Sequence, residues 1–279
     1  MNTSPTACAL PARSVAEVVI AVPLRLAGGS AIISKIRAAG AAMSRLALTT
    51  LSSCRSSSVC NHEAGTEDHN AAMSRYVELS HPVADGILTY PGLPAPHITD
   101  HTPRAQFHIG RIELIGNTGT YVDAPFHYRA DGADVAQLPA ERLLDIPIVV
   151  VRALERHTVT AAHLVDAGEL WGRAVLVHTG WDRHWGTPEY LRPGPHLDGS
   201  AARALVEANV ACVGIDSVNI DDMADPHRPV HTTLLDNDIP IIEHLTGLSA
   251  LPDSGARLYA LPAPIVGLGS FPVRAVAVL

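Results

Sequence analysis

A short segment over residues 116–127 holds several side chains that could take part in chemistry. In an extended strand, alternate side chains face the same way, so Asn117, Tyr121 and Asp123 share one face, with Gly119 leaving space among them. An amide, a phenol and a carboxylate gathered there are potential metal ligands or hydrogen-bonding groups for a polar substrate. The same pattern is also typical of a polar edge strand with no chemical role.

The end of this segment adds an imidazole to the group. Pro125 cannot donate to a sheet ladder, so the strand should end there and turn His127 toward the same region. A histidine beside Asp123 suits general acid–base chemistry.

A second candidate block covers residues 231–245. A short helix is expected to begin at His231, and residues 239–243 are expected to return as a strand that ends in Glu243. A histidine and a glutamate twelve positions apart are a weak signal when taken alone.

Two further segments carry polar or aromatic groups at the ends of expected strands. Trp181 follows one strand and could stack on a flat substrate, although a role in packing explains it equally well. Asp216 and Asp221 follow the next strand and could orient a neighbouring group, although aspartates in such positions most often cap turns.

Residues 117–127 resemble the signature of the cyclase family of hydrolases, which includes bacterial kynurenine formamidase and isatin hydrolase. The family pattern is His-x-Gly-Thr-His-x-Asp-x-Pro-x-His. Five of its positions match, namely Gly119, Thr120, Asp123, Pro125 and His127. Asn117 and Tyr121 replace the two leading histidines, which are metal ligands in the family. The segments around Trp181, Asp216 and His231 also resemble recurrent family elements.

The resemblance implies a fold, a reaction and a set of roles. The fold would be α/β, a single domain with a β-barrel-like mixed sheet core flanked by helices. The reaction would be hydrolysis of a C–N bond in a small amide or lactam, as in an arylformamidase, by water that a divalent metal activates. By position, Asp123, His231 and Glu243 would be retained metal ligands, and His127 would be the acid–base group. The family also implies a homodimer or a higher homo-oligomer.

The two replaced histidines leave three cases open. Loss of two nitrogen ligands leaves an oxygen-rich site, which would bind Mn²⁺ or Mg²⁺ in preference to Zn²⁺, and weakly. Alternatively, the site works without metal, with His127 as base, Glu243 or Asp123 orienting it, and Tyr121 or Asn117 donating to the substrate carbonyl. In the third case the chain is a catalytically silent protein that binds a small molecule. In all three cases, Asn117, Tyr121 and Trp181 are the residues expected to contact the substrate or ligand.

Composition excludes several other classes of function. The net charge is −8 and aromatic residues make up 4% of the chain, which disfavours nucleic-acid binding. The chain has no uninterrupted apolar run of about 18 residues, so we expect no membrane partner. The four cysteines lack the paired spacing of a zinc knuckle and predict free thiols in a cytoplasmic protein.

The elements that must position these groups begin after residue 72. Residues 1–72 are rich in Ala, Ser and Thr, and we expect a poorly structured extension, either a mis-assigned start or a targeting segment. Residues 73–279 form the expected hydrolase domain. Its strands are predicted over 76–82, 107–115, 146–151, 173–179, 210–215, 239–243 and 274–279. Its helices are predicted over 137–144, 160–168, the later part of 195–209, and from 231 onward.

Overall fold

A computed structural model describes residues 76–101 and 107–279 of the chain. The prediction for residues 1–72 lies outside this part of the sequence. Within the described residues, no helix is both long and apolar enough to cross a bilayer.

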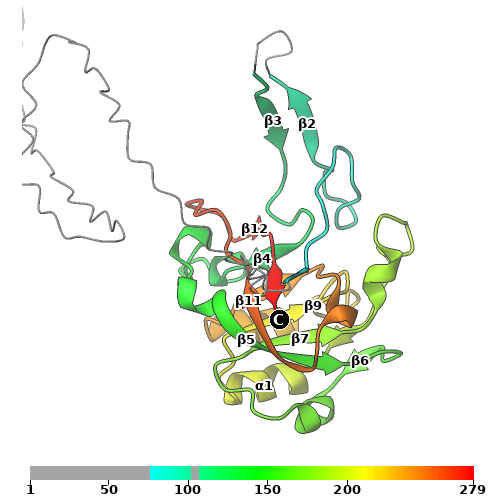
Figure 1. The fold of residues 1–279 in the computed structure, drawn as a ribbon, viewed down its shortest axis with the longest axis vertical. Helices are drawn as coiled ribbons and strands as arrows, with labels where there is room; N and C mark the ends of the chain where they lie inside the picture. Colours follow the sequence, from blue (N-terminus) through cyan, green and yellow to red (C-terminus); the bar gives the residue numbers. More distant parts are fainter. Residues whose placement is uncertain (1–75, 102–106) are drawn as a thin grey trace, which may run out of the picture. The chain divides into compact units, whose positions relative to one another are not determined.

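A curled, mixed sheet of nine strands forms the centre of the fold (Figure 1). In spatial order the strands are β1 (Tyr76–Glu78), β13 (Val276–Val278), β11 (Ser254–Tyr259), β5 (Leu144–Arg152), β7 (Ala174–His178), β9 (Cys212–Ile215), β10 (Ile241–Glu243), β4 (Tyr121–Asp123) and β12 (Ser270–Pro272). The four strands from β5 to β10 pair in parallel, and the outer strands pair antiparallel. This architecture confirms the predicted fold class.

The central strands are buried on both faces, as their runs of β-branched residues predict. Along β7, Val175 and Val177 pack into one apolar cluster, whereas Ala174 and Leu176 pack into another on the opposite face. Such alternation follows from the two-residue period of a strand. The sheet therefore has a hydrophobic core on each side.

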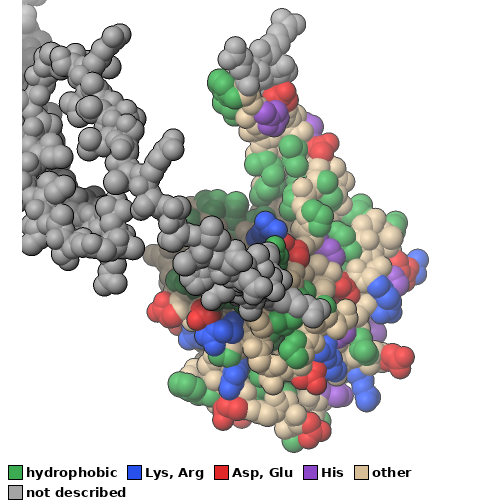
Figure 2. Space-filling view, in the orientation of Figure 1, with side chains coloured by type: hydrophobic (Ala, Val, Ile, Leu, Met, Phe, Trp, Pro, Cys, Tyr) green, Lys and Arg blue, Asp and Glu red, His purple; other side chains and the backbone are tan. Residues whose placement is uncertain are grey.

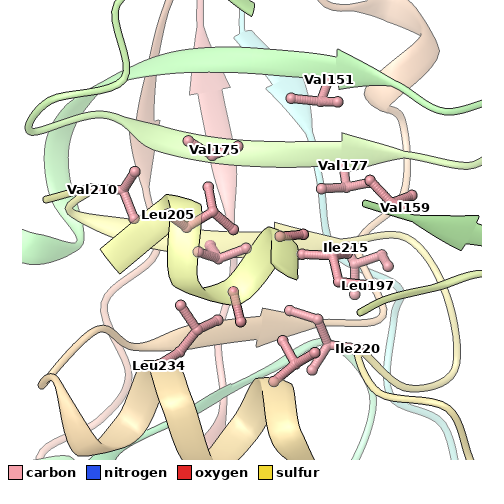
Figure 3. Packing of buried hydrophobic residues seen from close by; sticks show 14 of the residues in the cluster. Val151, Val159, Val175, Val177, Leu197, Leu205, Val210, Ile215, Ile220 and Leu234 are labelled. Carbon is pink, nitrogen blue, oxygen red and sulfur yellow. The ribbon is translucent and has the colours of Figure 1, made fainter. Parts of the chain in front are cut away.

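Two α-helices cover one of these faces (Figure 3). Helix α1 (Gly199–Glu207) contributes Leu205, and helix α2 (Pro229–Asp236) contributes Leu234. Asp198 caps α1, because its Oδ1 accepts hydrogen bonds from the backbone amides of residues 200 and 201 at 2.9 Å. Both helices begin close to where the sequence predicts them.

Short 3-10 helices make most of the remaining connections. They are Pro125–His127, Val135–Gln137, Ala140–Arg142, Ala161–Ala167, Trp181–His184 and Leu248–Ala250. The single helix predicted over 137–144 is wrong, because two separate 3-10 turns flank Pro139 there. A small parallel pair, β6 (Thr158–Val159) with β8 (His196–Leu197), lies apart from the main sheet.

The strand predicted over 107–115 forms, but it does not join the main sheet. Among the described strands, β3 (Gly110–Glu113) pairs only with β2 (His97–Asp100), and every residue of both strands is exposed. The resulting hairpin extends away from the sheet (Figure 1) and carries hydrophobic side chains on its surface (Figure 2). Ile98 and Ile112 face each other across it and are 39% and 53% exposed.

Candidate active site

Strand β4 is the element around which the polar cluster forms. It is three residues long, so the extended reading of 116–120 is wrong: Gly119 has a φ of +67° and the chain bends through residues 116–120. A Cβ at Gly119 would also lie 2.8 Å from the Val83 side chain. The bend brings Asn117 back toward β4, where Tyr121 and Asp123 share one face as expected.

The register of β4 selects its polar neighbours. Tyr121 lies opposite Glu243 on β10, and Asp123 lies opposite Ser270 on β12. The Ser270 hydroxyl donates a short hydrogen bond to Oδ1 of Asp123. Each buried polar side chain of β4 is therefore matched by a polar group from one adjacent strand.

Two helix starts bring the imidazoles to the same place. Pro125 opens the 3-10 helix that carries His127, and Pro229 opens α2, which carries His231. The two imidazole rings lie 5.9 Å apart, and the His127 Nδ1 lies 3.2 Å from the Ser270 hydroxyl. The predicted turn at Pro125 is confirmed.

Asp123, His127 and His231 offer ligand atoms that all lie within 4.8 Å of one another. The Asp123 Oδ2 is buried without a hydrogen-bond partner among the described residues, and it lies 3.7 Å from the His231 Nε2. That separation is too long for a hydrogen bond and slightly longer than the roughly 3–3.5 Å between two ligands that each lie about 2.1 Å from one ion, so a small side-chain shift would let both atoms bind the same ion.

Asp221 fixes the orientation of His231. Its Oδ2 accepts from the His231 Nδ1 at 2.6 Å, and its two oxygens also accept from the backbone amides of residues 230 and 231. A carboxylate behind one imidazole nitrogen holds the ring so that the other nitrogen faces the site. Asp221, rather than Asp216, fills the orienting role that the sequence left open between them.

Asp216 does not contact His231 but binds the loop that follows β7. Its carboxylate accepts from the backbone amides of Thr179 and Gly180 and from the Thr179 hydroxyl, which ties together the ends of two strands. Burial raises the pKa of Asp216 to about 6 despite these hydrogen bonds.

Glu243 is engaged at both oxygens. The Tyr121 phenol donates a short hydrogen bond to Oε2, and the amide of Ile220 donates to Oε1 at 2.6 Å. The Oε1 also lies 3.6 Å from the His231 Nε2. The structure thus places Glu243 beside the Asp123–His127–His231 group, but each of its oxygens already accepts one hydrogen bond.

Asn117 and Tyr121 each contact one of the buried carboxylates. The Asn117 amide lies 3.4 Å from Oδ1 of Asp123 and 3.3 Å from the Ser270 hydroxyl. Burial, with the charges of Glu243 and Asp123, raises the pKa of Tyr121 well above its usual range. Tyr121 is therefore a neutral hydrogen-bond donor at pH 7.

The buried charges shape the acidity of the site. Burial raises the pKa of Glu243 to about 7, although the charge of His231 opposes the rise. Burial alone would lower the pKa of His231, but its contacts with Asp123 and Asp221 and the charge of Glu243 raise it to about 10. Three carboxylates so close together require a positive charge among them, whether a proton or a metal ion.

The cluster lies on the wall of a cavity of about 180 Å³. Of the residues that the sequence singled out, Asn117, Tyr121, His127, His231 and Glu243 line it, whereas Asp123 is fully buried and does not. A volume below the range of about 300–1,000 Å³ typical of drug-sized ligands fits a small substrate.

Several cavity residues were missed by sequence reasoning, and one predicted residue lies elsewhere. Tyr90, Tyr128 and Arg228 line the cavity, although no spacing rule connects them to the signature. Arg228 follows an aspartate-rich loop and precedes a proline, which was the only available signal. Trp181 does not line this cavity; its indole Nε1 donates to the Tyr190 carbonyl at 3.1 Å.

Comparison with known sequences gives a family and a set of relatives. The family model Cyclase, described as "Putative cyclase", matches residues 77–222. A kynurenine formamidase from Bacillus cereus (strain ATCC 14579) is 26% identical over 212 residues, which cover 73% of this chain and 97% of that protein. A kynurenine formamidase from Salinibacter ruber is 29% identical over 208 residues, covering 72% and 95%.

Solved structures show the same fold. Isatin hydrolase A from Labrenzia aggregata superposes with a TM-score of 0.67 at 24% identity, covering 74% of this chain and 93% of that one. A structure described as a potential metal-dependent hydrolase with cyclase activity gives a TM-score of 0.63 at 25% identity, covering 73% and 96%.

Proposed function

The chain belongs to the cyclase family, and on that basis we propose that it is a hydrolase that cleaves the C–N bond of a small amide or lactam, in the manner of an arylformamidase. One observation carries the proposal: two histidines that line a small cavity lie against a buried aspartate, one of whose carboxylate oxygens is left unpartnered among the described residues. The names of the relatives, kynurenine formamidase and isatin hydrolase, support an amide or lactam as the substrate.

The residues present fit a divalent metal ion. The unpartnered Asp123 Oδ2 is buried, and the His231 Nε2 faces it because Asp221 occupies the other ring nitrogen. Asp123 and His231 would therefore hold the ion. When bound, such an ion lowers the pKa of water from 15.7 toward about 7 and polarises the substrate carbonyl.

The third ligand is either Glu243, as the family resemblance implies, or His127. Both oxygens of Glu243 already accept hydrogen bonds, whereas the His127 Nε2 has no hydrogen bond within the described part of the chain. The geometry therefore favours His127. Two imidazoles and one carboxylate suit zinc or manganese, whereas Glu243 in place of His127 would shift the preference toward manganese or magnesium.

If Glu243 is the third ligand instead, the His127 Nε2 stays free, and His127 is then the group best placed to move a proton. Its side chain is 30% exposed, whereas Asp123 and His231 are buried, so it is the member of the group most accessible to a substrate. As an acid–base group it would take a proton from the attacking water and deliver it to the leaving nitrogen. Ser270 positions the ring through its hydroxyl, 3.2 Å from Nδ1.

Asn117 and Tyr121 hold the buried carboxylates in place. Asn117 contacts the Asp123 carboxylate, and Tyr121 donates to the Glu243 carboxylate. The two residues that replace family histidines therefore stabilise these buried carboxylates through hydrogen bonds. Both also line the cavity, where their polar groups can contact a substrate amide.

A second copy of the chain is the partner we propose beyond the substrate. An isolated two-stranded hairpin is marginally stable in water, and the β2–β3 hairpin exposes Ile98 and Ile112. Pairing between copies would cover this surface. The cytoplasmic location stays a prediction; Cys212, a free and buried thiol, is compatible with it.

Release of formate and amine from N-formyl arylamines, and ring opening of isatin, test the proposed function. Purified chain should turn over at least one of these compounds, and the Asp123→Asn variant should not, because it loses the central carboxylate. If the folded chain binds such amides without cleaving them in the presence of added zinc, manganese or magnesium, it is a binding protein on a hydrolase scaffold instead.

A further inference from the structure

Arg228 is the only lysine or arginine among the residues that line the cavity in the described part of the chain. Its backbone is left-handed, with a φ of 47° and a ψ of 58°, immediately before Pro229. A residue with a β-carbon is strained in this conformation, and such strain is concentrated at functional sites. The same bend begins α2 and so places Arg228 three residues before His231.

The guanidinium of Arg228 is held entirely by neutral acceptors. Its Nη1 donates to Asn219 Oδ1 and to the Asp222 carbonyl, both at 3.1 Å, and its Nη2 donates to the Tyr90 hydroxyl at 3.0 Å. Within the described residues, no carboxylate lies within 4.0 Å of it. Five other arginines do form such ion pairs, namely Arg129, Arg152, Arg192, Arg257 and Arg274.

These contacts leave part of the guanidinium free. Of its five N–H groups, three donate to the acceptors above, so the Nε–H and one Nη2–H have no partner among the described residues. Those two groups form one edge of the planar fork, and that edge matches the two oxygens of a carboxylate. Asn219 and Tyr90, which line the cavity themselves, fix the fork in place.

The buried acidic groups near the cavity make this cation favourable for an acidic substrate. Asp123, Glu243 and Asp221 are buried beside the site, and any of their negative charge that a metal ion or a proton does not neutralise repels a substrate anion. The half-buried guanidinium of Arg228, which lines the cavity, offsets that repulsion. Tyr90 and Tyr128 add aromatic surface beside it, which suits a flat substrate body.

We propose that Arg228 is an anion subsite that binds a carboxylate of the substrate, so that the preferred substrates are aryl amides that carry a carboxylate group. The proposal rests on the amide hydrolase function above and specifies its substrate class. Tyr90 and Asn219 act as positioning residues, because they hold the guanidinium without touching the reacting atoms.

A matched pair of substrates tests the proposal. Formanilide is neutral, and its 2-, 3- and 4-carboxylated analogues differ from it only by the carboxylate. Wild-type chain should show a higher kcat/KM for at least one carboxylated analogue than for formanilide. Arg228→Gln should lower the kcat/KM for that analogue by at least about tenfold more than for formanilide, chiefly through KM, because a charge-assisted hydrogen bond is lost.

Two further variants separate this role from a structural one. Arg129→Gln removes a guanidinium that contacts the other end of α2 but does not line the cavity, so it should leave the substrate preference unchanged. Arg228→Lys keeps the charge without the fork and should recover only part of the preference. Equal losses on both substrates in Arg228→Gln would overturn the proposal.

Binding separates failure of this proposal from failure of the proposed function. If the chain cleaves none of the four amides, calorimetric titration with 2-, 3- and 4-aminobenzoate still reports on the subsite. Binding by the wild type that is at least about tenfold weaker in Arg228→Gln would support the anion subsite without any turnover. Equal binding to both proteins, or no binding to either, would refute it.

Discussion

The Tyr121 hydroxyl donates a hydrogen bond to Oε2 of Glu243 across the antiparallel pairing of β4 with β10. Tyr121 stands where the family pattern has a histidine. The phenol of Tyr121 therefore supplies no nitrogen ligand at this position. It also donates to the Glu243 carboxylate, which uses one lone pair that could otherwise bind a metal ion.

Removal of the Tyr121 hydroxyl should destabilise the fold. Tyr121→Phe leaves Oε2 of Glu243 buried without its donor, so we expect a loss of about 1–3 kcal/mol in the free energy of unfolding, measured by urea denaturation. Tyr259→Phe is a matched control, because its hydroxyl also donates to a carboxylate, Asp145, but at an exposed site. Similar losses in the two variants would contradict the account.

Introducing both family histidines should strengthen metal binding. In the double variant Asn117→His with Tyr121→His, the new imidazoles would stand where side chains now contact Asp123 and Glu243. Two added nitrogen ligands should tighten zinc binding by at least about tenfold in a competition titration with a chromogenic chelator. An unchanged affinity would mean that these positions do not have the geometry of a metal site.

His127→Gln should distinguish between the two duties proposed for that residue. Turnover should fall by more than roughly a hundredfold in either case, because the variant lacks the acid–base group or a metal ligand. Bound metal, measured by elemental analysis, should fall as well if the His127 Nε2 is the third ligand, and should stay the same if Glu243 is. A near-native rate would exclude both duties.

The stability of the chain should depend on His244 at acid pH. Burial is the main cause that lowers the pKa of His244 to about 3, and its Nδ1 has no partner among the described residues. Between about pH 3 and 6.5 the unfolded state therefore binds the proton and the folded state does not. Stability is fully present above pH 6.5 and is lost as the pH falls through this window, by up to about 1.4 kcal/mol per pH unit.

His244→Asn tests this linkage, because asparagine tolerates the left-handed backbone at this position, where φ is 57°. Between pH 4 and 6, the slope of the unfolding free energy against pH should be smaller in the variant than in the wild type. The comparison of slopes is independent of the packing lost with the ring. Parallel slopes would show that His244 does not titrate with unfolding.

Much of the site could be predicted from the sequence, because the positions of its residues follow from local features such as prolines and the periodicity of apolar residues. Pro125 ends β4 and turns His127 inward, and the helix that carries His231 follows from its pattern, although it begins two residues earlier, at Pro229. Arg228 could not be found in this way, since its place on the cavity wall depends on hydrogen bonds to Asn219 and Tyr90, the second of which is 138 residues away.

The same distinction explains the errors in the fold. The alternating pattern of residues 107–115 correctly predicts a strand, but no local feature shows that it pairs with β2 rather than with the main sheet. Likewise, residues 116–120 read as extended, yet the left-handed backbone of Gly119 bends them. Sheet membership and backbone bends depend on tertiary packing.

The metal content of the purified chain tests the central claim most directly. Elemental analysis before and after chelation, with amide hydrolysis measured on both samples, should show about one zinc or manganese ion per chain, activity lost on chelation, and activity restored by that metal. Asp123→Asn should lack both the metal and the activity. A chain that contains no metal and hydrolyses the amide at an undiminished rate after chelation would contradict the account.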